Sequence, residues 1–293
     1  MSRDTTQRNQ QASANTYHGQ QVALLTQHGK ESVIAPVLAE LLGCRVEKVD
    51  GFDTDLLGTF TRDITREGSQ LEAARKKARI GMELSGLSIG IASEGAFGPD
   101  PFTFFMLPRN RELLIWIDDR LGIEIVATVD GLTNLSHRLV ESWEEAEDFA
   151  RSAGFPEHHL VVRPVNENHP EFRKGLADWA SLQDAVTWAL DFAPNRHAFV
   201  ETDMRAFANP TRLENIRLAT VDLARRLTSL CLACGAPGFA LTGKVRGLPC
   251  EDCGTPTHEA KADIHRCVRC EHQVLVEREL EYASARYCDY CNP

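Results

Sequence analysis

The sequence predicts a mixed α/β domain followed by a small C-terminal zinc-ribbon module. Strand and helix signals alternate from Val22 to about Phe192, which is the order of elements expected of a mixed α/β domain. Eight of the nine cysteines lie in the last 63 residues, where they form four C-x-x-C pairs. The 293-residue chain is 43% hydrophobic and 25% charged, so it has room for one sizeable globular domain and one small module.

The α/β pattern consists of short apolar runs separated by amphipathic segments. The apolar runs predict strands at residues 21–26, 45–49, 87–92, 159–165 and 198–201. Residues 113–117 and 123–129 flank a turn and predict an antiparallel hairpin. Helices are expected at residues 30–43, 68–85, 141–153, 181–192 and 210–229, the last capped by Asn209 with Pro210 at its first position.

These elements divide the chain into four parts. Residues 1–17 are rich in Gln, Asn, Ser and Thr and are expected to form a disordered tail. Residues 18–200 form the α/β domain, and residues 201–229 contain a connecting helix. Residues 230–293 form a module too small for a good core, so bound metal must supply much of its stability.

The four cysteine pairs predict two structural zinc ions, because each pair offers two thiolates to one metal from one tight turn. The pairs are Cys231/Cys234, Cys250/Cys253, Cys267/Cys270 and Cys288/Cys291. Sequential pairing, first with second and third with fourth, gives two tandem ribbons and is favoured over interleaved pairing. Four thiolates close each site to water, so a catalytic zinc is not expected.

Disulfides and an iron–sulfur cluster are the alternatives to zinc, and disulfides require an oxidising compartment. The first 20 residues are polar and lack the apolar core of a secretory signal, so a cytoplasmic location is expected. No run of about 20 apolar residues is present, so a membrane span is not expected either.

The charge of the cysteine-rich module argues against nucleic-acid binding. Residues 229–293 contain seven Lys or Arg and nine Asp or Glu, and each four-thiolate zinc site adds about −2. Nucleic-acid affinity depends mainly on clustered Lys and Arg. The module is therefore expected to act as a lid, a contact in a homodimer or a docking surface.

Two loops of the α/β domain are candidates for chemistry. The turn formed by Thr26, Gln27, His28, Gly29 and Lys30 joins a strand to a helix, where free amides and a lysine favour an anion. The alternative is an exposed turn with a surface lysine. After the strand at 87–92, Glu94 lies between Ser93 and Gly95 and has a position suited to binding Mg²⁺ or a ligand; the alternative is an incidental acid in a turn.

Two further polar groups have both a functional and a structural interpretation. Glu72 and Lys76 are four residues apart on a predicted helix, so a surface ion pair explains them equally well. Arg205 and Arg212 lie near the end of the strand at 198–201 and have the chemistry to grip a phosphate. An internal ion pair that fixes this turn is the favoured interpretation.

Three short motifs resemble the inosine triphosphatase superfamily of NTP pyrophosphatases, which includes the Maf-like proteins. Residues 25–30 read LTQHGK where that family has T-x-N-P-x-K, and residues 72–78 read EAARKKA where it has E-N-A-x-x-K-A. Residues 92–95 read ASEG where the family has D-D-S-G or I-E-G-G. The similarity is good over residues 22–95 and loose to residue 195. The whole chain also resembles a bacterial family that joins such a domain to a cysteine-rich tail, which implies no activity.

The resemblance implies an ITPase-like fold and a set of site residues. Lys30 and Lys77 would bind a triphosphate, Glu94 would hold Mg²⁺, and Glu72 would be a second acid. Thr26, His28, Gly29, Ser93 and Gly95 would line the substrate site. Ser93 replaces one acid of the family's double-Asp motif, and the acid after the second strand is not fixed, since Asp53, Asp55 and Asp63 all compete for the role.

Three functions follow as expectations. The first is a Mg²⁺-dependent hydrolase acting on a nucleotide or a related phosphorylated small molecule. The second is a non-catalytic nucleotide sensor or docking adaptor that carries structural zinc. The third is a zinc-ribbon nucleic-acid binder, which the charge of the module disfavours.

Overall fold

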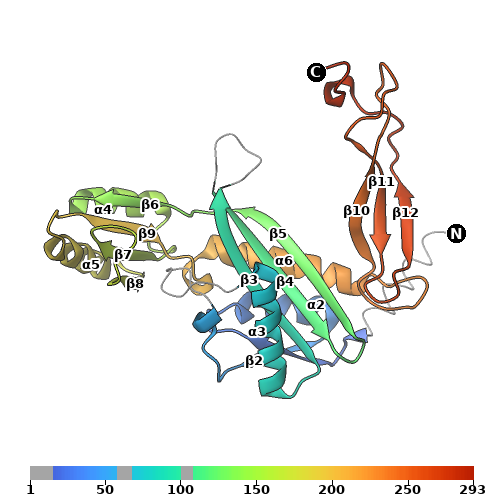
Figure 1. The fold of residues 1–293 in the computed structure, drawn as a ribbon. Helices are drawn as coiled ribbons and strands as arrows, with labels where there is room; N and C mark the ends of the chain where they lie inside the picture. Colours follow the sequence, from blue (N-terminus) through green and yellow to red (C-terminus); the bar gives the residue numbers. More distant parts are fainter. Residues whose placement is uncertain (1–15, 58–67, 100–107) are drawn as a thin grey trace.

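The computed structural model describes residues 16–57, 68–99 and 108–293, and its largest unit is a five-stranded mixed sheet (Figure 1). The strand order is β2-β1-β3-β4-β5. The strands are β1 (Gln21–Leu25), β2 (Arg45–Val49), β3 (Ile89–Pro99), β4 (Pro108–Asp118) and β5 (Ile123–Leu132). β1 is parallel to β2 and β3, whereas β3, β4 and β5 form an antiparallel meander. The predicted mixed α/β fold and the predicted hairpin are confirmed.

Helices cover both faces of this sheet. α3 (Gln70–Ser85) covers one face, where Ala74, Ala78 and Met82 pack against strand residues in one apolar cluster. α2 (Glu31–Leu42) and α6 (Pro210–Thr228) cover the other face (Figure 1). α6 does more than connect two parts of the chain, because Ile216, Leu223 and Leu227 are fully buried in the main core.

Residues 137–202 form a separate small α/β lobe inserted between β5 and α6. Its elements are β6 (His137–Val140), α4 (Trp143–Ala153), β7 (Leu160–Pro164), β8 (Arg173–Leu176), α5 (Trp179–Phe192) and β9 (Ala198–Thr202). The antiparallel sheet has the order β6-β9-β7-β8, and α4 and α5 pack on it in a core of their own. A short helical turn, η2 (Ala206–Ala208), leads from this lobe into α6.

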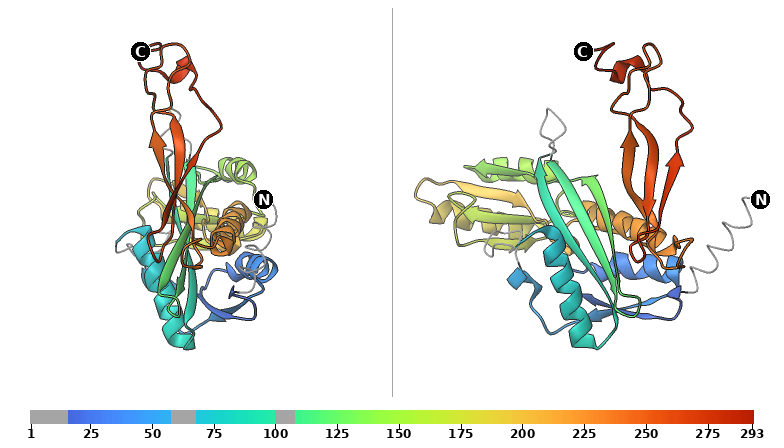
Figure 2. Two further views of the ribbon diagram at one scale, coloured as in Figure 1. Left: turned by 90° about the vertical axis from the view of Figure 1, so that its right-hand side faces the viewer. Right: turned by 45° about the vertical axis from the view of Figure 1, so that its right-hand side comes forward.

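Residues 230–293, which we call the arm, project away from the rest of the molecule (Figures 1 and 2). The arm is built on an antiparallel three-stranded sheet, with a short helical turn, η3 (Ala285–Tyr287), near the C-terminus. Its strands are β10 (Ala240–Arg246), β11 (Ala260–Arg266) and β12 (Gln273–Glu277).

The N-terminal segment is ordered from earlier in the chain than expected. Residues 1–15 of the predicted tail lie outside the described residues. Tyr17 is fully buried, and its ring meets the edge of Trp116 with ring centroids 4.8 Å apart. Tyr17, the last residue of the predicted tail, therefore packs in the core, and the boundary of the tail stays a prediction. A bilayer-spanning helix is absent from the described part of the chain.

Candidate phosphate-binding edge and cysteine clusters

Lys30 lies at the carboxyl edge of the parallel strands. β1 and β3 are parallel neighbours, so the turn after β1 and the continuation of β3 meet at the same edge of the sheet. Gly29 adopts a positive φ of 71°, which turns the chain into α2. The Lys30 side chain is buried, and its Nζ donates a 2.6 Å hydrogen bond to the carbonyl oxygen of Ser93.

On the α3 face, Lys77 and Glu94 form a buried ion pair. Lys77 Nζ lies 2.6 Å from Glu94 Oε2, and the two side chains are 11% and 7% exposed. Gln70 fixes the strand beside them, since its Nε2 donates to the carbonyl oxygens of Glu94 and Arg111 at 2.6 and 2.9 Å. A pair this buried has lost most of its hydration, so it persists only because each charge compensates the other.

On the α6 face, Glu112 and Arg212 form a second buried pair. Arg212 Nε donates to Glu112 Oε1 at 2.8 Å, and Ser93 Oγ lies 3.3 Å from Glu112 Oε2. Asn110 Nδ2 also donates to Glu112 Oε1, at 3.1 Å. A Cβ atom on Gly95 would lie only 2.4 Å from Arg212 Nη2, so the glycine makes room for the guanidinium.

Sequence reasoning missed Glu112 and Asn110, because they precede the strand that was predicted at residues 113–117. They occupy alternate positions at the start of β4, where both are fully buried, just before its apolar run at residues 113–117. Buried polar residues in such a strand need partners. The partners come from β3 and α6, which are distant in the sequence.

Lys30 stands where the two buried pairs meet, and its pKa reflects this environment. Burial and, to a smaller degree, the charge of Arg212 lower the pKa of Lys30 to about 7, whereas Glu94 and Glu112 act in the opposite direction. Among the described residues, no carboxylate lies within ion-pair distance of Lys30. When Lys30 is protonated, three cations (Lys30, Lys77 and Arg212) face two carboxylates (Glu94 and Glu112), so this cluster is one positive charge in excess.

His28 forms a hydrogen-bonded pair with Asp55 beside the same turn. His28 Nε2 lies 2.9 Å from Asp55 Oδ1, and the two side chains are 22% and 30% exposed. The pKa of His28 is lowered by burial, although Asp55 opposes this, so the imidazole is neutral near pH 7. Thr26 Oγ1 accepts a weak 3.4 Å hydrogen bond from the His28 amide. The half-exposed Phe207 packs over the turn, with its ring centroid 6.2 Å from that of His28.

Of the three competing acids, Asp55 is the one placed at the turn by this pairing with His28. Asp53 is exposed and accepts a hydrogen bond from the amide of Asp55. Asp63 lies outside the described residues.

Two predicted site residues have structural partners elsewhere. Glu72 is exposed and forms a capping box with Ser69 at the start of α3, accepting from the Ser69 amide at 2.7 Å. Arg205 forms a two-point ion pair with Asp203 and packs on Phe207, with the guanidinium carbon 4.7 Å from the ring centroid. The Arg205–Asp203 pair is the internal ion pair expected at this turn, whereas Arg212 pairs with Glu112 of β4. Glu72 caps α3 in place of the expected surface pair with Lys76.

The eight cysteines form two groups, but their pairing is interleaved. Cys231, Cys234, Cys267 and Cys270 form the first group, and Cys250, Cys253, Cys288 and Cys291 form the second. The favoured sequential pairing is therefore wrong. Each pair is separated from the next by one strand or strand-length segment, so successive pairs fall at opposite ends of the antiparallel meander.

The geometry of both groups fits a tetrahedral metal ion. Sulfur atoms approach at 3.6 and 3.7 Å in the first group and at 3.7 and 3.9 Å in the second. A tetrahedron of sulfurs with Zn–S bonds of about 2.3 Å has edges of about 3.8 Å. These distances are too long for disulfides, whose S–S bond is about 2.05 Å. Each group can hold one structural metal ion, and the ligand set fits zinc.

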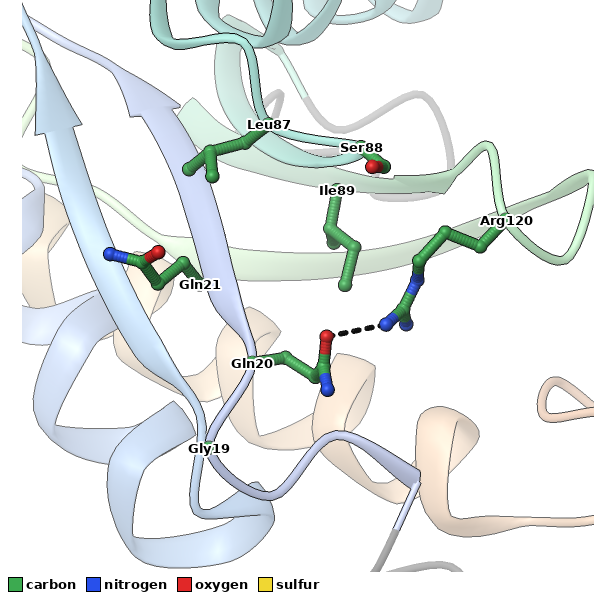
Figure 3. A pocket seen from close by; sticks show the side chains of 7 residues that line it. All are labelled: Gly19, Gln20, Gln21, Leu87, Ser88, Ile89 and Arg120. Atoms are coloured by element: carbon green, nitrogen blue, oxygen red, sulfur yellow. Dashed lines mark hydrogen bonds between the residues drawn. The ribbon is translucent and has the colours of Figure 1, made fainter.

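A separate hollow of about 190 Å³ lies at the opposite, amino end of β1 and β3 (Figure 3). Gln20, Ser88 and Arg120 are among its lining residues, and the Arg120 guanidinium donates to Gln20 Oε1 across it. None of the predicted site residues lines this hollow.

The fold and these groups define a mixed α/β protein that has a buried polar cluster at a sheet edge and an arm with two four-cysteine groups, each able to hold a metal ion. Residues 77–293 match the model of a family described as a domain of unknown function, DUF6671, and the chain belongs to this family. The matched range includes Lys77, Glu94, Arg212 and all four cysteine pairs, and it begins after Lys30. No curated protein and no solved structure matches the chain. The resemblance to the inosine triphosphatase superfamily stays a prediction, since the family that matches is a different one.

Proposed function

We propose that the protein binds the phosphate groups of a nucleotide, or of a related phosphorylated small molecule, at the carboxyl edge of β1 and β3, and that it hydrolyses a phosphoanhydride there with Mg²⁺. The observation that carries this proposal is the placement of Lys30. Its buried ammonium has three N–H donors, and within the described residues one of them donates a hydrogen bond, to the Ser93 carbonyl oxygen. A ligand anion would supply the missing partners and balance the excess positive charge.

The remaining residues have roles that suit this reaction. Lys77 would pair with a phosphate oxygen when Glu94 binds the metal ion, because Mg²⁺ takes one or two carboxylates together with substrate phosphates. When bound, Mg²⁺ would neutralise charge on the phosphates. The proton on Nε2 of His28 faces Asp55, which leaves Nδ1 as an acceptor for the proton of an attacking water. The water oxygen would bond to phosphorus as the bridging P–O bond breaks towards the leaving phosphate.

A non-catalytic sensor or adaptor is the second candidate, and a specific observation favours it. Glu94 and Glu112 are both held by cations, Lys77 and Arg212, and Ser93 stands where the inosine triphosphatase superfamily has an acid. A protein that only binds the phosphorylated ligand needs the cations but no free carboxylate. The arm would then serve as its docking element.

A panel of nucleoside triphosphates separates the two candidates. The wild type, Glu94→Gln and Lys30→Ala are assayed with Mg²⁺ for phosphate or pyrophosphate release, and nucleotide binding is measured in parallel. We expect turnover by the wild type, binding without turnover by Glu94→Gln, and lost binding in Lys30→Ala. The matched control is Glu72→Gln, which alters an exposed capping acid on α3 and should keep full activity.

The outcomes distinguish the candidates. Saturable binding without turnover by the wild type would establish the sensor and contradict the hydrolase. Unchanged binding by Lys30→Ala would contradict both, because both depend on the Lys30 turn. DNA binding with an affinity that falls steeply with salt would instead favour the nucleic-acid binder.

A further inference from the structure

The two ends of the arm have different surface chemistry. The proximal cysteine group lies next to the end of α6, and the residues between its paired cysteines are Leu232, Ala233, Val268 and Arg269. The distal group lies at the far tip, and the corresponding residues are Glu251, Asp252, Asp289 and Tyr290. Both sites have the same ligands, so metal binding alone does not account for this difference.

The distal end exposes three of the four tyrosines of the chain. Tyr282, Tyr287 and Tyr290 are 57%, 54% and 77% exposed, and the neighbouring Leu280 is 66% exposed. Tyr282 precedes Ala283, which is bridged to Cys250, and Tyr287 and Tyr290 lie within two residues of Cys288, so all three lie beside the distal cysteine group. Several large exposed side chains around one point mark an interaction surface, and tyrosine is enriched at the energetic centres of interfaces.

The same end is strongly acidic. Five carboxylates, those of Glu251, Asp252, Glu279, Glu281 and Asp289, are exposed there, whereas Arg286 is the one exposed cation between residues 279 and 293. Within the described part of the chain, Lys and Arg form no ion pair with these five, and Asp289 contacts His258 at 2.9 Å. A four-thiolate zinc site adds about −2 to this charge.

We propose that the distal end of the arm is a docking surface for an arginine-rich segment of a partner protein. Guanidinium groups stack on tyrosine rings and pair with carboxylates at the same time, so this one side chain satisfies both features of the surface. Nucleic acid is repelled by the same charge. A second copy of the chain would bring two acidic ends together, which like-charge repulsion opposes.

The position of this surface suits a docking role. The strands of the arm separate the distal end from the main body (Figure 2). A seven-residue strand such as β10 spans about 24 Å. A partner bound at the tip therefore leaves the Lys30 edge uncovered. This inference is independent of the proposed reaction, since it uses no residue of the sheet edge.

The test uses the full-length zinc-loaded protein and a fluorescent peptide of alternating arginine and glycine. A second peptide with citrulline in place of arginine keeps the shape and removes the charge. We expect the arginine peptide to bind the wild type. We expect about tenfold weaker binding by the double variant Tyr282→Ala/Tyr290→Ala, because two stacking contacts are lost. Leu232→Ala is the matched control at the proximal end, where it alters an equally exposed side chain between two cysteines, and its affinity should be unchanged.

Zinc content is measured for each protein. If the alanine variant loses metal, Tyr282→Phe/Tyr290→Phe is tested in its place. The phenylalanine variant keeps the rings and should retain the affinity of the wild type. Equal binding of the arginine peptide by the wild type and by a zinc-loaded alanine variant would overturn the proposal. So would equal binding of the citrulline peptide, tighter binding of DNA, or a concentration-dependent dimer that the tyrosine substitutions dissolve.

Discussion

The buried position of Lys30 lowers the stability of the fold and places its ammonium group where we propose that phosphate binds. Burial lowers its pKa from 10.5 to about 7, so folding is opposed by the removal of its charge from water. Between pH 7 and 10.5 the unfolded chain holds a proton that the folded protein does not, so this contribution makes stability rise with pH in that window. Below pH 7 Lys30 is charged in both the folded and the unfolded state, so the full cost of burying its charge opposes folding.

Replacing Lys30 with methionine is predicted to stabilise the fold. The isosteric apolar side chain removes the buried charge, so we expect a gain of about 1–3 kcal/mol at pH 6.5 that shrinks at pH 9. Urea unfolding at the two pH values measures it, with Lys76→Met on the exposed face of α3 as the control. A destabilised Lys30→Met protein would mean that the attraction between Lys30 and the nearby carboxylates exceeds the free-energy cost of burying its charge.

Some of the sheet-edge residues could be predicted from the sequence, and the reason is local. Lys30 and Glu94 each follow an apolar run, and parallel neighbouring strands bring such positions together. Glu112 and Arg212 are a hundred residues apart and form one ion pair. Only the β3–β4 register and the packing of α6 bring them together, and no short stretch of sequence predicts either of these.

At the scale of elements, the β3–β4 hairpin and α6 fit together because Gly95 has no side chain. Gly95 is paired with Glu112 in the register of the two strands, and both face α6. A methyl group there would meet Arg212 and Glu112 at 2.4 and 2.6 Å, which is too close for any real contact. The hairpin and the helix would have to separate, and the buried ion pair would be disturbed.

Gly95→Ala is therefore predicted to destabilise the protein by about 2 kcal/mol, since overpacking forces buried groups to move. Gly98→Ala in the same strand is the matched control, because a methyl group there meets nothing within 4 Å. Urea unfolding of the two variants gives the comparison. Equal stabilities would show that Arg212 can move aside freely.

The arrangement of the arm shows what the spacing of the cysteine pairs could and could not indicate. Spacers of 15, 13 and 17 residues separate the four pairs, and each is long enough for one strand. The spacing was sufficient to predict two metal groups. It did not select the pairing, because the weak alternation in the arm's exposed strands gives little strand signal. An antiparallel meander, once recognised, leaves interleaved pairing as the natural solution.

At the scale of the whole molecule, the two cysteine groups differ in their contacts with the main body. The proximal group is joined to the main body: the Gly238 amide donates to the Arg226 carbonyl of α6 at 3.1 Å. A Cβ on Gly238 would meet both Ile125 of β5 and Val268 between two cysteines. The distal group contacts other residues of the arm, as in the bridge between Cys250 and Ala283.

Removing one ligand from each group should therefore have unequal effects. Cys231→Ser is predicted to release one zinc and to increase hydrogen exchange both in the arm and in the C-terminal turns of α6, because its site holds the junction. Cys250→Ser should release one zinc and increase hydrogen exchange only at the distal end of the arm, while α6 stays protected. Hydrogen–deuterium exchange with zinc quantification measures both. Loss of protection in α6 in both variants would mean that the arm folds as a single cooperative unit, and that its tip is coupled to the sheet edge through α6.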